Sequence, residues 1–183
     1  MIQTTLDWLV NTAALVTLAS YAWSMRRHFR AVNVSAQANL LFIASAGTGF
    51  ALLAQIWSDE QPIAALCAGL ILQIASFALF WWAIRASRSA QLRYVFDEDA
   101  PATLVVDGPY RFIRHPFYSA YILFWSGWSL ASWSWWSIIP ALGLAAAYAA
   151  AARAEEARFA RTAMSADYAA YVGRTGAFFP KLR

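Results

Sequence analysis

The sequence predicts an all-α, polytopic membrane protein, and two observations carry this prediction. First, 61% of its 183 residues are hydrophobic and 13% are charged, whereas about a quarter of the residues of a soluble domain are charged. Second, the apolar residues form long runs, and a helix needs about 20 such residues to cross about 30 Å of hydrocarbon. We therefore expect a single membrane domain built from helices.

Five apolar runs are candidates for transmembrane helices. The first three approach or exceed the spanning length, and Asp7 is the one charged residue within them. The other two are arms of roughly 16 residues, slightly short at 1.5 Å per residue unless they extend into the interface. These two arms form a helical hairpin whose turn lies at Ser132 to Ser137. The runs are residues 6–25, 38–57, 62–84 and, divided by that turn, 116–152.

The basic residues set the expected orientation, because cytoplasmic flanks retain Lys and Arg. All 14 basic residues follow the first, third or fifth run, and the opposite flanks hold none. Five crossings then place the N-terminus outside and the C-terminus in the cytoplasm. The charges of the first run follow its apolar residues, so we expect a retained helix and no cleaved secretory signal. Thirteen arginines against one lysine, with abundant alanine, indicate a GC-rich genome and a bacterial inner membrane.

This topology divides one membrane domain into four parts. The first three helices precede a cytoplasmic connection, in which the acidic run Asp97 to Asp99 indicates a solvated loop. A transmembrane hairpin and a cytoplasmic tail follow, and Tyr168 and Tyr171 are expected to pack that tail against the domain. The parts are residues 1–84, 85–115, 116–152 and 153–183.

Several classes of function are disfavoured by what the chain lacks. Cys67 is the single cysteine, so neither a disulfide nor a cysteine-based metal site is available. His28 and His115 are the only histidines, which argues against a histidine-rich metal centre. Ionisable groups are nearly absent from the apolar runs, which disfavours a transporter. The net charge of +4 lies along the cytoplasmic rim and suits anionic lipid better than nucleic acid.

Hairpin geometry links two distant segments at the cytoplasmic face. His115 lies 20 residues before Trp135, at the hairpin turn, and Glu155 lies 20 residues after it. Two antiparallel helices of equal rise bring these positions to the same depth, so we expect them to be neighbours. Pro116 suits the first turn of the fourth helix, with His115 at the cap. The unpaired N–H groups of that helix end would favour a carboxylate or phosphate.

The predicted site is zwitterionic and lies at a membrane surface. Arg111 and Arg114 precede the helix, and Glu155 and Glu156 supply the opposite charge. Tyr110, Tyr118 and Tyr121 line it. S-adenosylmethionine fits these charges, because carboxylates can bind its ammonium, an arginine or helix end its carboxylate, and tyrosine faces its sulfonium. On charges alone it is one candidate among several.

A motif makes the interpretation specific. The chain contains GPYRFIRHPFY at residues 108–118, then the pair Glu155-Glu156, then a tail that includes Arg174-Thr175 and closes with FFP at residues 178–180. From Gly108 to Pro180 it resembles the isoprenylcysteine carboxyl methyltransferase and phospholipid methyltransferase superfamily of integral membrane enzymes. Ala120 is a departure, because many such relatives have glycine there. The resemblance implies an S-adenosylmethionine site formed by the Arg114-His115-Pro116 segment, Tyr118 and the two glutamates, closed by the C-terminal segment.

The resemblance and the charges together give candidate roles. Methyl transfer is an in-line displacement, so the protein mainly aligns the reactants and excludes water. A carboxylate acceptor needs a cation, for which Arg111 and Arg174 are candidates, and an amine acceptor needs a base such as Glu156. The competing structural roles are membrane anchoring for the arginines and helical pairing of the glutamates with Arg158 or Arg161. Catalytic candidates are Arg111, Glu156 and Arg174; cofactor-binding candidates are Tyr110, Arg114, His115, Pro116, Tyr118, Glu155 and Glu156; no metal is expected.

The motif is compatible with more than one methyl acceptor. The resemblance allows esterification of a prenylated cysteine, N-methylation of a phospholipid headgroup or S-methylation of a small thiol. We favour a lipophilic acceptor that enters sideways from the bilayer, in a reaction resembling that of isoprenylcysteine carboxyl O-methyltransferase. A nicotinamide-dependent membrane reductase is an alternative, although no Gly-rich dinucleotide loop is present. A non-catalytic membrane subunit is another alternative, and nothing in the sequence indicates the oligomeric state.

Overall fold

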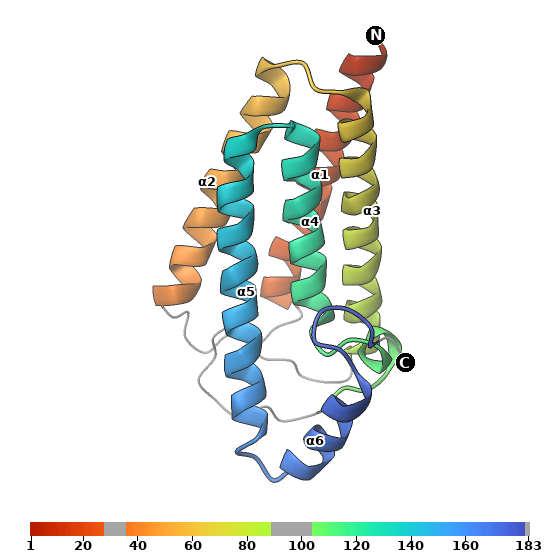
Figure 1. The fold of residues 1–183 in the computed structure, drawn as a ribbon, viewed down its shortest axis with the longest axis vertical. Helices are drawn as coiled ribbons and strands as arrows, with labels where there is room; N and C mark the ends of the chain where they lie inside the picture. The colour runs from red at the N-terminus through yellow and green to blue at the C-terminus, as the bar shows by residue number, and fades with distance from the viewer. Residues whose placement is uncertain (28–35, 89–103, 182–183) are drawn as a thin grey trace.

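The computed structural model describes residues 1–27, 36–88 and 104–181, and in these ranges the secondary-structure elements are all helices, without strands. The all-α prediction is therefore confirmed. Five long helices lie alongside one another, and a short sixth helix lies at the end where the C-terminus is found (Figure 1). His28 and the acidic run 97–99 lie outside the described residues. The elements are α1 (Ile2–Arg27), α2 (Ala36–Ser58), α3 (Ile63–Ala86), η1 (Gly108–Arg111), α4 (Pro116–Ser132), η2 (Trp135–Ser137), α5 (Ile138–Phe159) and α6 (Ser165–Arg174).

Within the described residues, three helical segments are long and apolar enough to cross a membrane, namely Asn39–Ser58, Ile63–Ala86 and Trp135–Phe159. They match the second, third and fifth predicted runs, and the protein is accordingly a membrane protein. The 17 residues of α4 make it shorter than these segments. The 26 residues of α1 include Asp7 and end in two arginines.

The packing of α3 against α4 forms the centre of the bundle. Gly69 and Gly127 face each other so closely that a Cβ on Gly69 would overlap the Gly127 carbonyl oxygen. Small residues that allow helix backbones to approach are typical of contacts between membrane helices. Two turns further along, the Ser76 hydroxyl donates to the Ala120 carbonyl at 2.7 Å and lies 2.7 Å from the Tyr21 hydroxyl. Helices α1, α3 and α4 are thereby fixed in register.

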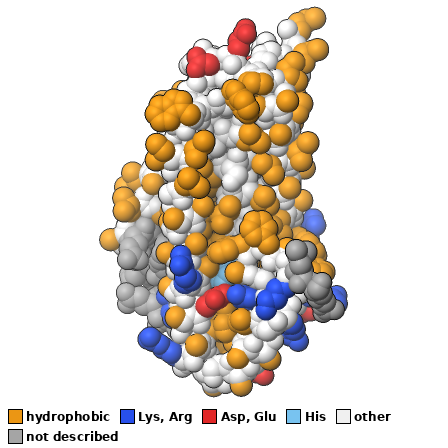
Figure 2. All heavy atoms as spheres, viewed as in Figure 1, with side chains coloured by type: hydrophobic (Ala, Val, Ile, Leu, Met, Phe, Trp, Pro, Cys, Tyr) orange, Lys and Arg blue, Asp and Glu red, His pale blue; other side chains and the backbone are white. Residues whose placement is uncertain are grey.

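Apolar and charged side chains occupy different parts of the surface. Figure 2 shows hydrophobic side chains over the length of the bundle, with Lys and Arg gathered at the end that carries α6. The exposed large apolar residues include Phe50, Ile71 and Leu142, each at least 64% exposed, on three different helices. Exposed apolar patches of this extent are rare on soluble monomers and mark surfaces that contact a membrane or a partner. The length of the bundle is therefore suited to contact with lipid. The basic end is where the candidate site lies.

Candidate active site

The start of α4 is the foundation of the site. Pro116 is its first residue and His115 its N-cap, as the sequence predicted. The preceding turn η1 is pressed against α3, and a Cβ on Gly108 would lie 2.6 Å from the Ala86 side chain. Gly108 also has a φ of +58°, a conformation that glycine adopts at little cost. This glycine therefore allows the loop to approach α3 and deliver residues 110–115 to the helix end.

The C-terminal strap, residues 175–178, lies along the segment that enters α4. The Gly176 amide donates to the Phe112 carbonyl at 3.1 Å, and the amides of Arg114 and His115 donate to Gly176 and Ala177 at 2.8 and 3.1 Å. The N–H group of the N-cap residue His115 is therefore occupied by the strap and is not available to a ligand, which corrects the expectation for this one group of the helix end. The end of α4 is thus partly capped by the chain itself.

An ion-pair network connects α4, α5 and the strap. The Arg114 Nε donates to Glu156 Oε1 at 2.8 Å, and its Nη1 donates to the Thr175 carbonyl at 2.6 Å. The His115 Nε2 lies 3.0 Å from the same Glu156 oxygen. The Arg114 side chain is only 10% exposed and that of Glu156 28%. Glu156 therefore pairs across the hairpin with Arg114 and His115 and not with Arg158 or Arg161.

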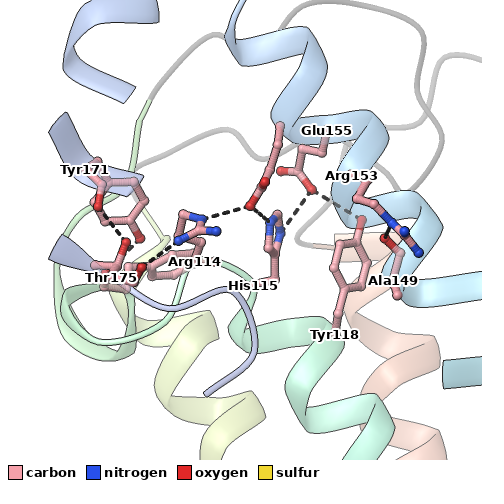
Figure 3. Close-up of polar contacts among 10 residues, drawn as sticks. Arg114, His115, Tyr118, Ala149, Arg153, Glu155, Tyr171 and Thr175 are labelled. Atoms are coloured by element: carbon pink, nitrogen blue, oxygen red, sulfur yellow. Dashed lines mark hydrogen bonds and ion pairs between the residues drawn. The ribbon is translucent and has the colours of Figure 1, made fainter. Parts of the chain in front are cut away.

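The second glutamate lies on the other side of the imidazole (Figure 3). Glu155 Oε2 is 3.7 Å from His115 Nδ1 and accepts a hydrogen bond from the Tyr118 hydroxyl at 3.3 Å. The predicted proximity of His115 and Glu155 is confirmed. The side chain of Glu155 is 37% exposed, whereas that of His115 is 5% exposed. A buried imidazole thus lies between two carboxylates, one held by Arg114 and one facing outward.

The tail is packed against the domain by aromatic residues, as predicted. Tyr168 stacks on Phe159 with a centroid separation of 4.6 Å and an interplanar angle of 5°. The Tyr171 hydroxyl donates to the Tyr110 carbonyl at 2.7 Å, and both residues are buried. Burial raises the pKa of Tyr171 to about 12, so this hydroxyl stays protonated and able to donate. The Tyr110 backbone is thereby tied to α6.

Two of the predicted catalytic residues lie outside the network. Arg111 is exposed at the end of η1. Arg174 is exposed at the end of α6, and its guanidinium carbon lies 5.8 Å from the centroid of the Tyr171 ring. The structure therefore brings six of the predicted residues together around the start of α4 and leaves these two at the surface. The six are Arg114, His115, Pro116, Tyr118, Glu155 and Glu156.

An apolar cavity of about 450 Å³ lies among α1, α2, α4 and α5. Tyr148 on α5 lines it and also stacks against Tyr118, with ring centroids 6.1 Å apart and an interplanar angle of 17°. Tyr148 was not predicted as a site residue, although it is the one polar residue in the apolar stretch 141–152. Ser119 was not predicted either, and its hydroxyl donates to the Phe178 carbonyl at 2.9 Å and fixes the strap.

Comparison with known proteins agrees with this geometry. No curated protein matches the chain. The phospholipid methyltransferase family matches residues 64–166, which is more than half of the sequence. The matched segment runs from α3 through the end of the hairpin and contains Arg114, His115 and both glutamates. The chain belongs to the phospholipid methyltransferase family.

Proposed function

We propose that the protein is an integral membrane, S-adenosylmethionine-dependent methyltransferase that methylates a lipophilic acceptor. The observation that carries this proposal is the Arg114–Glu156–His115–Glu155 network, which lies at the charged end of an apolar bundle and inside the family match. Membership of a methyltransferase family supplies the reaction class. A carboxylate acceptor, as in isoprenylcysteine O-methylation, is the reaction we favour from the motif. The family description favours N-methylation of a phospholipid headgroup as the second candidate.

The proposed topology has five crossings, with the N-terminus outside and the C-terminus and site in the cytoplasm. Helices α1 and α4 run beside the three helices that are apolar enough to span, which supports their crossing as well (Figure 1). At 1.5 Å per residue the 26 residues of α1 extend about 39 Å. The basic residues gather at one end, which is the cytoplasmic end under the positive-inside rule. A bacterial inner membrane is the proposed location.

The residues at the site fit S-adenosylmethionine in kind. Glu155 is a partly exposed carboxylate with one oxygen, Oε1, facing no partner among the described side chains, which suits the cofactor's ammonium. The centroid of the His115 ring lies 5.5 Å from that of Tyr118 and 5.9 Å from that of Phe178. These three rings offer faces to a sulfonium or an adenine. We assign Pro116 and Tyr110 to shaping the loop around these groups.

We propose that Arg114 does not bind the cofactor through its charge. Its Nε and Nη1 groups are already engaged by Glu156 and the strap. It therefore holds the strap and Glu156 in place, and Glu156 in turn orients the His115 ring. Arg111 and Arg174, exposed at the same end, are proposed to attract an anionic acceptor or its headgroup.

The chemistry needs little more than alignment. When bound beside Glu155, His115 and Tyr118, S-adenosylmethionine would supply a methyl carbon activated by its sulfonium leaving group. The strap and the buried aromatic rings exclude water from this step. Glu155 is placed to accept the proton that an amine acceptor releases, whereas a carboxylate acceptor releases none.

The proposal is tested by transfer of a labelled methyl group in nanodiscs. The wild-type protein is incubated with methyl-labelled S-adenosylmethionine and a total bacterial lipid extract, and label is sought in the organic phase. We expect label in lipid, lost in Glu155→Gln and retained in Glu60→Gln, a matched change of an exposed acid at the far end of the bundle. Oxidation of a reduced nicotinamide without methyl transfer would contradict the proposal and favour a reductase.

A further inference from the structure

We infer that Tyr148 is the residue that determines which methyl acceptor the protein binds, because it separates the apolar cavity from the polar site. The cavity takes one hydrocarbon chain, and the ring of Tyr148 sets how far that chain can extend toward Glu155. This inference rests on the proposed function and specifies the acceptor as a single-chain amphiphile.

The shape of the cavity is the first argument. Its volume of about 450 Å³ lies in the lower half of the range for small-molecule pockets, about 300–1,000 Å³. On α1 its lining runs from Leu15 to Met25, ten residue steps that correspond to about 15 Å of helix rise. A long, narrow space of this volume suits one extended chain better than the two chains of a diacyl lipid.

The chemistry of the wall is the second argument. None of the described residues that line the cavity is charged, and the lining consists of leucines, aromatic rings and small residues. Leu15 and Phe50, at its edge on α1 and α2, are 51% and 75% exposed on the surface that faces lipid. A hydrocarbon chain that passes between α1 and α2 therefore goes from one apolar medium to another. Water-soluble ligands gain nothing from such a route.

The position of Tyr148 is the third argument. It is the one α5 residue in the described lining, and its ring contacts Tyr118, whose hydroxyl donates to Glu155. Tyr148 thus lies between the cavity and the residue that bonds the outward-facing carboxylate. Tyr121 of α4 lies beside it, lines the same cavity and has its ring centroid 6.4 Å from that of Tyr118. A phenol hydroxyl inside a membrane is costly without a partner. The Tyr148 hydroxyl accepts a hydrogen bond from Trp125 Nε1 at 3.3 Å, which fixes the ring.

The acceptor can then be placed by its two ends. Its hydrocarbon chain fills the cavity among Leu18, Phe42 and Trp128 and ends at the Tyr148 ring, with its polar end directed toward Tyr118 and Glu155. Truncation of Tyr148 would extend the cavity toward Glu155. Each additional buried methylene is worth about 0.8 kcal/mol, which corresponds to about fourfold in affinity. The Tyr148→Ala variant should therefore prefer a longer chain than the wild type.

Photolabelling in nanodiscs tests the inference without a methyl-transfer assay. The probe is a linear alkyl amine with a diazirine at the end of its chain, and the competitors are unmodified linear alkyl amines of increasing length. We expect labelled peptides from the cavity wall, and a Gly49→Leu variant to reduce labelling about tenfold because the new side chain enters the cavity. Gly143→Leu is the matched control, because a Cβ there meets nothing within 4 Å.

The role of Tyr148 is read from the competitor series. In Tyr148→Ala the affinity for chains longer than the wild-type optimum should rise about fourfold for each methylene that becomes buried. Tyr148→Phe keeps the ring and should keep the wild-type preference. An unchanged preference in Tyr148→Ala, or an equal shift in Tyr148→Phe, would overturn the assignment. Label confined to the outer surface of the helices would overturn the cavity itself.

A separate titration with S-adenosylmethionine distinguishes the two levels of the proposal. If the wild type binds the cofactor but the cavity is not labelled, the inference fails while the proposed function stands. If the wild type does not bind the cofactor, the proposed function fails, and labelling then reports only a lipid-binding cavity. Cofactor binding should be unchanged in Gly49→Leu, because this residue lies on α2, away from the network.

Discussion

Arg114 should be the residue whose loss releases the C-terminal strap. Among the described residues, it is the one side chain that donates both to Glu156 on α5 and to the Thr175 carbonyl in the strap. Replacing it with alanine removes two donors at once and leaves Glu156 with His115 as its partner at the site. The strap would then be held by its backbone bonds and by the Ser119 hydroxyl.

The size of the effect follows from these contacts. A hydrogen bond to a charged group contributes about 1.5–3 kcal/mol and a bond from an arginine to a carbonyl falls in the same class. Because the Glu156 side chain is 28% exposed, we take the lower end of this range for each bond. Loss of both then costs about 3 kcal/mol, which corresponds to about a 150-fold increase in the population with the strap open.

Hydrogen exchange measures that population directly. The Gly176 amide is bonded to the Phe112 carbonyl, so its exchange rate reports opening of the strap. We expect this amide to exchange about 150-fold faster in Arg114→Ala nanodiscs than in the wild type. Arg114→Lys should recover little, because a lysine ammonium does not reproduce the two-donor geometry of guanidinium. Arg111→Ala, an exposed neighbour, is the control and should leave the rate unchanged.

A folded Arg114→Ala variant whose Gly176 amide exchanged at the wild-type rate would contradict the role of Arg114 in holding the strap. The strap would then be fixed by its backbone bonds alone, and Arg114 would be free to serve a ligand. Unchanged circular dichroism is the criterion that the variant is folded.

Three further predictions concern packing, the strap and pH. Gly69→Leu should lower the free energy of unfolding by about 3 kcal/mol or more, since its side chain would overlap the α4 backbone. Gly143→Leu is the control and should not lower it. Equal thermal unfolding of both variants would contradict the α3–α4 contact. Gly176→Ala should weaken S-adenosylmethionine binding in a titration, because a Cβ there overlaps the Phe179 carbonyl; wild-type affinity would show that the strap does not form part of the site. Burial raises the folded-state pKa of Tyr171 to about 12, above an unfolded value of about 10. The stabilisation of the folded state by the protonated Tyr171 hydroxyl is therefore complete below pH 10 and is lost as pH rises through 12. Tyr171→Phe should remove this step from the pH dependence of hydrogen exchange in the tail, and a pH profile identical to that of the wild type would disprove this role of the hydroxyl.

Helical geometry explains what could be predicted from the sequence. The rise of a helix is constant, so counting residues from the hairpin turn placed His115 beside Glu155 without knowledge of any side chain. Pro116 marked the start of α4 because its missing N–H is tolerated at that position alone. Tyr168 and Tyr171 were expected to pack the tail against the domain, and Tyr168 stacks on Phe159 at the end of α5.

Long-range pairing explains what could not be predicted. The bridge between Ile113 and Gly176 joins backbones that are distant in sequence, and no periodicity records such a contact. For the same reason the sequence could not show that Arg114 donates to the strap, and it was assigned to the cofactor instead. The cavity is formed by side chains of four helices and depends on how these helices are spaced. Tyr148 therefore acquired its significance only in the folded structure.

The most direct test of the central claim is calorimetric titration of S-adenosylmethionine and S-adenosylhomocysteine into the protein in nanodiscs. We predict saturable binding of both, weakened at least about tenfold by Glu155→Gln and by His115→Ala, since each removes a hydrogen bond or ion pair at the site. Glu60→Gln should bind as the wild type does. Absence of binding in folded wild-type protein, or equal affinity in all three variants, would contradict the placement of a cofactor site at the start of α4.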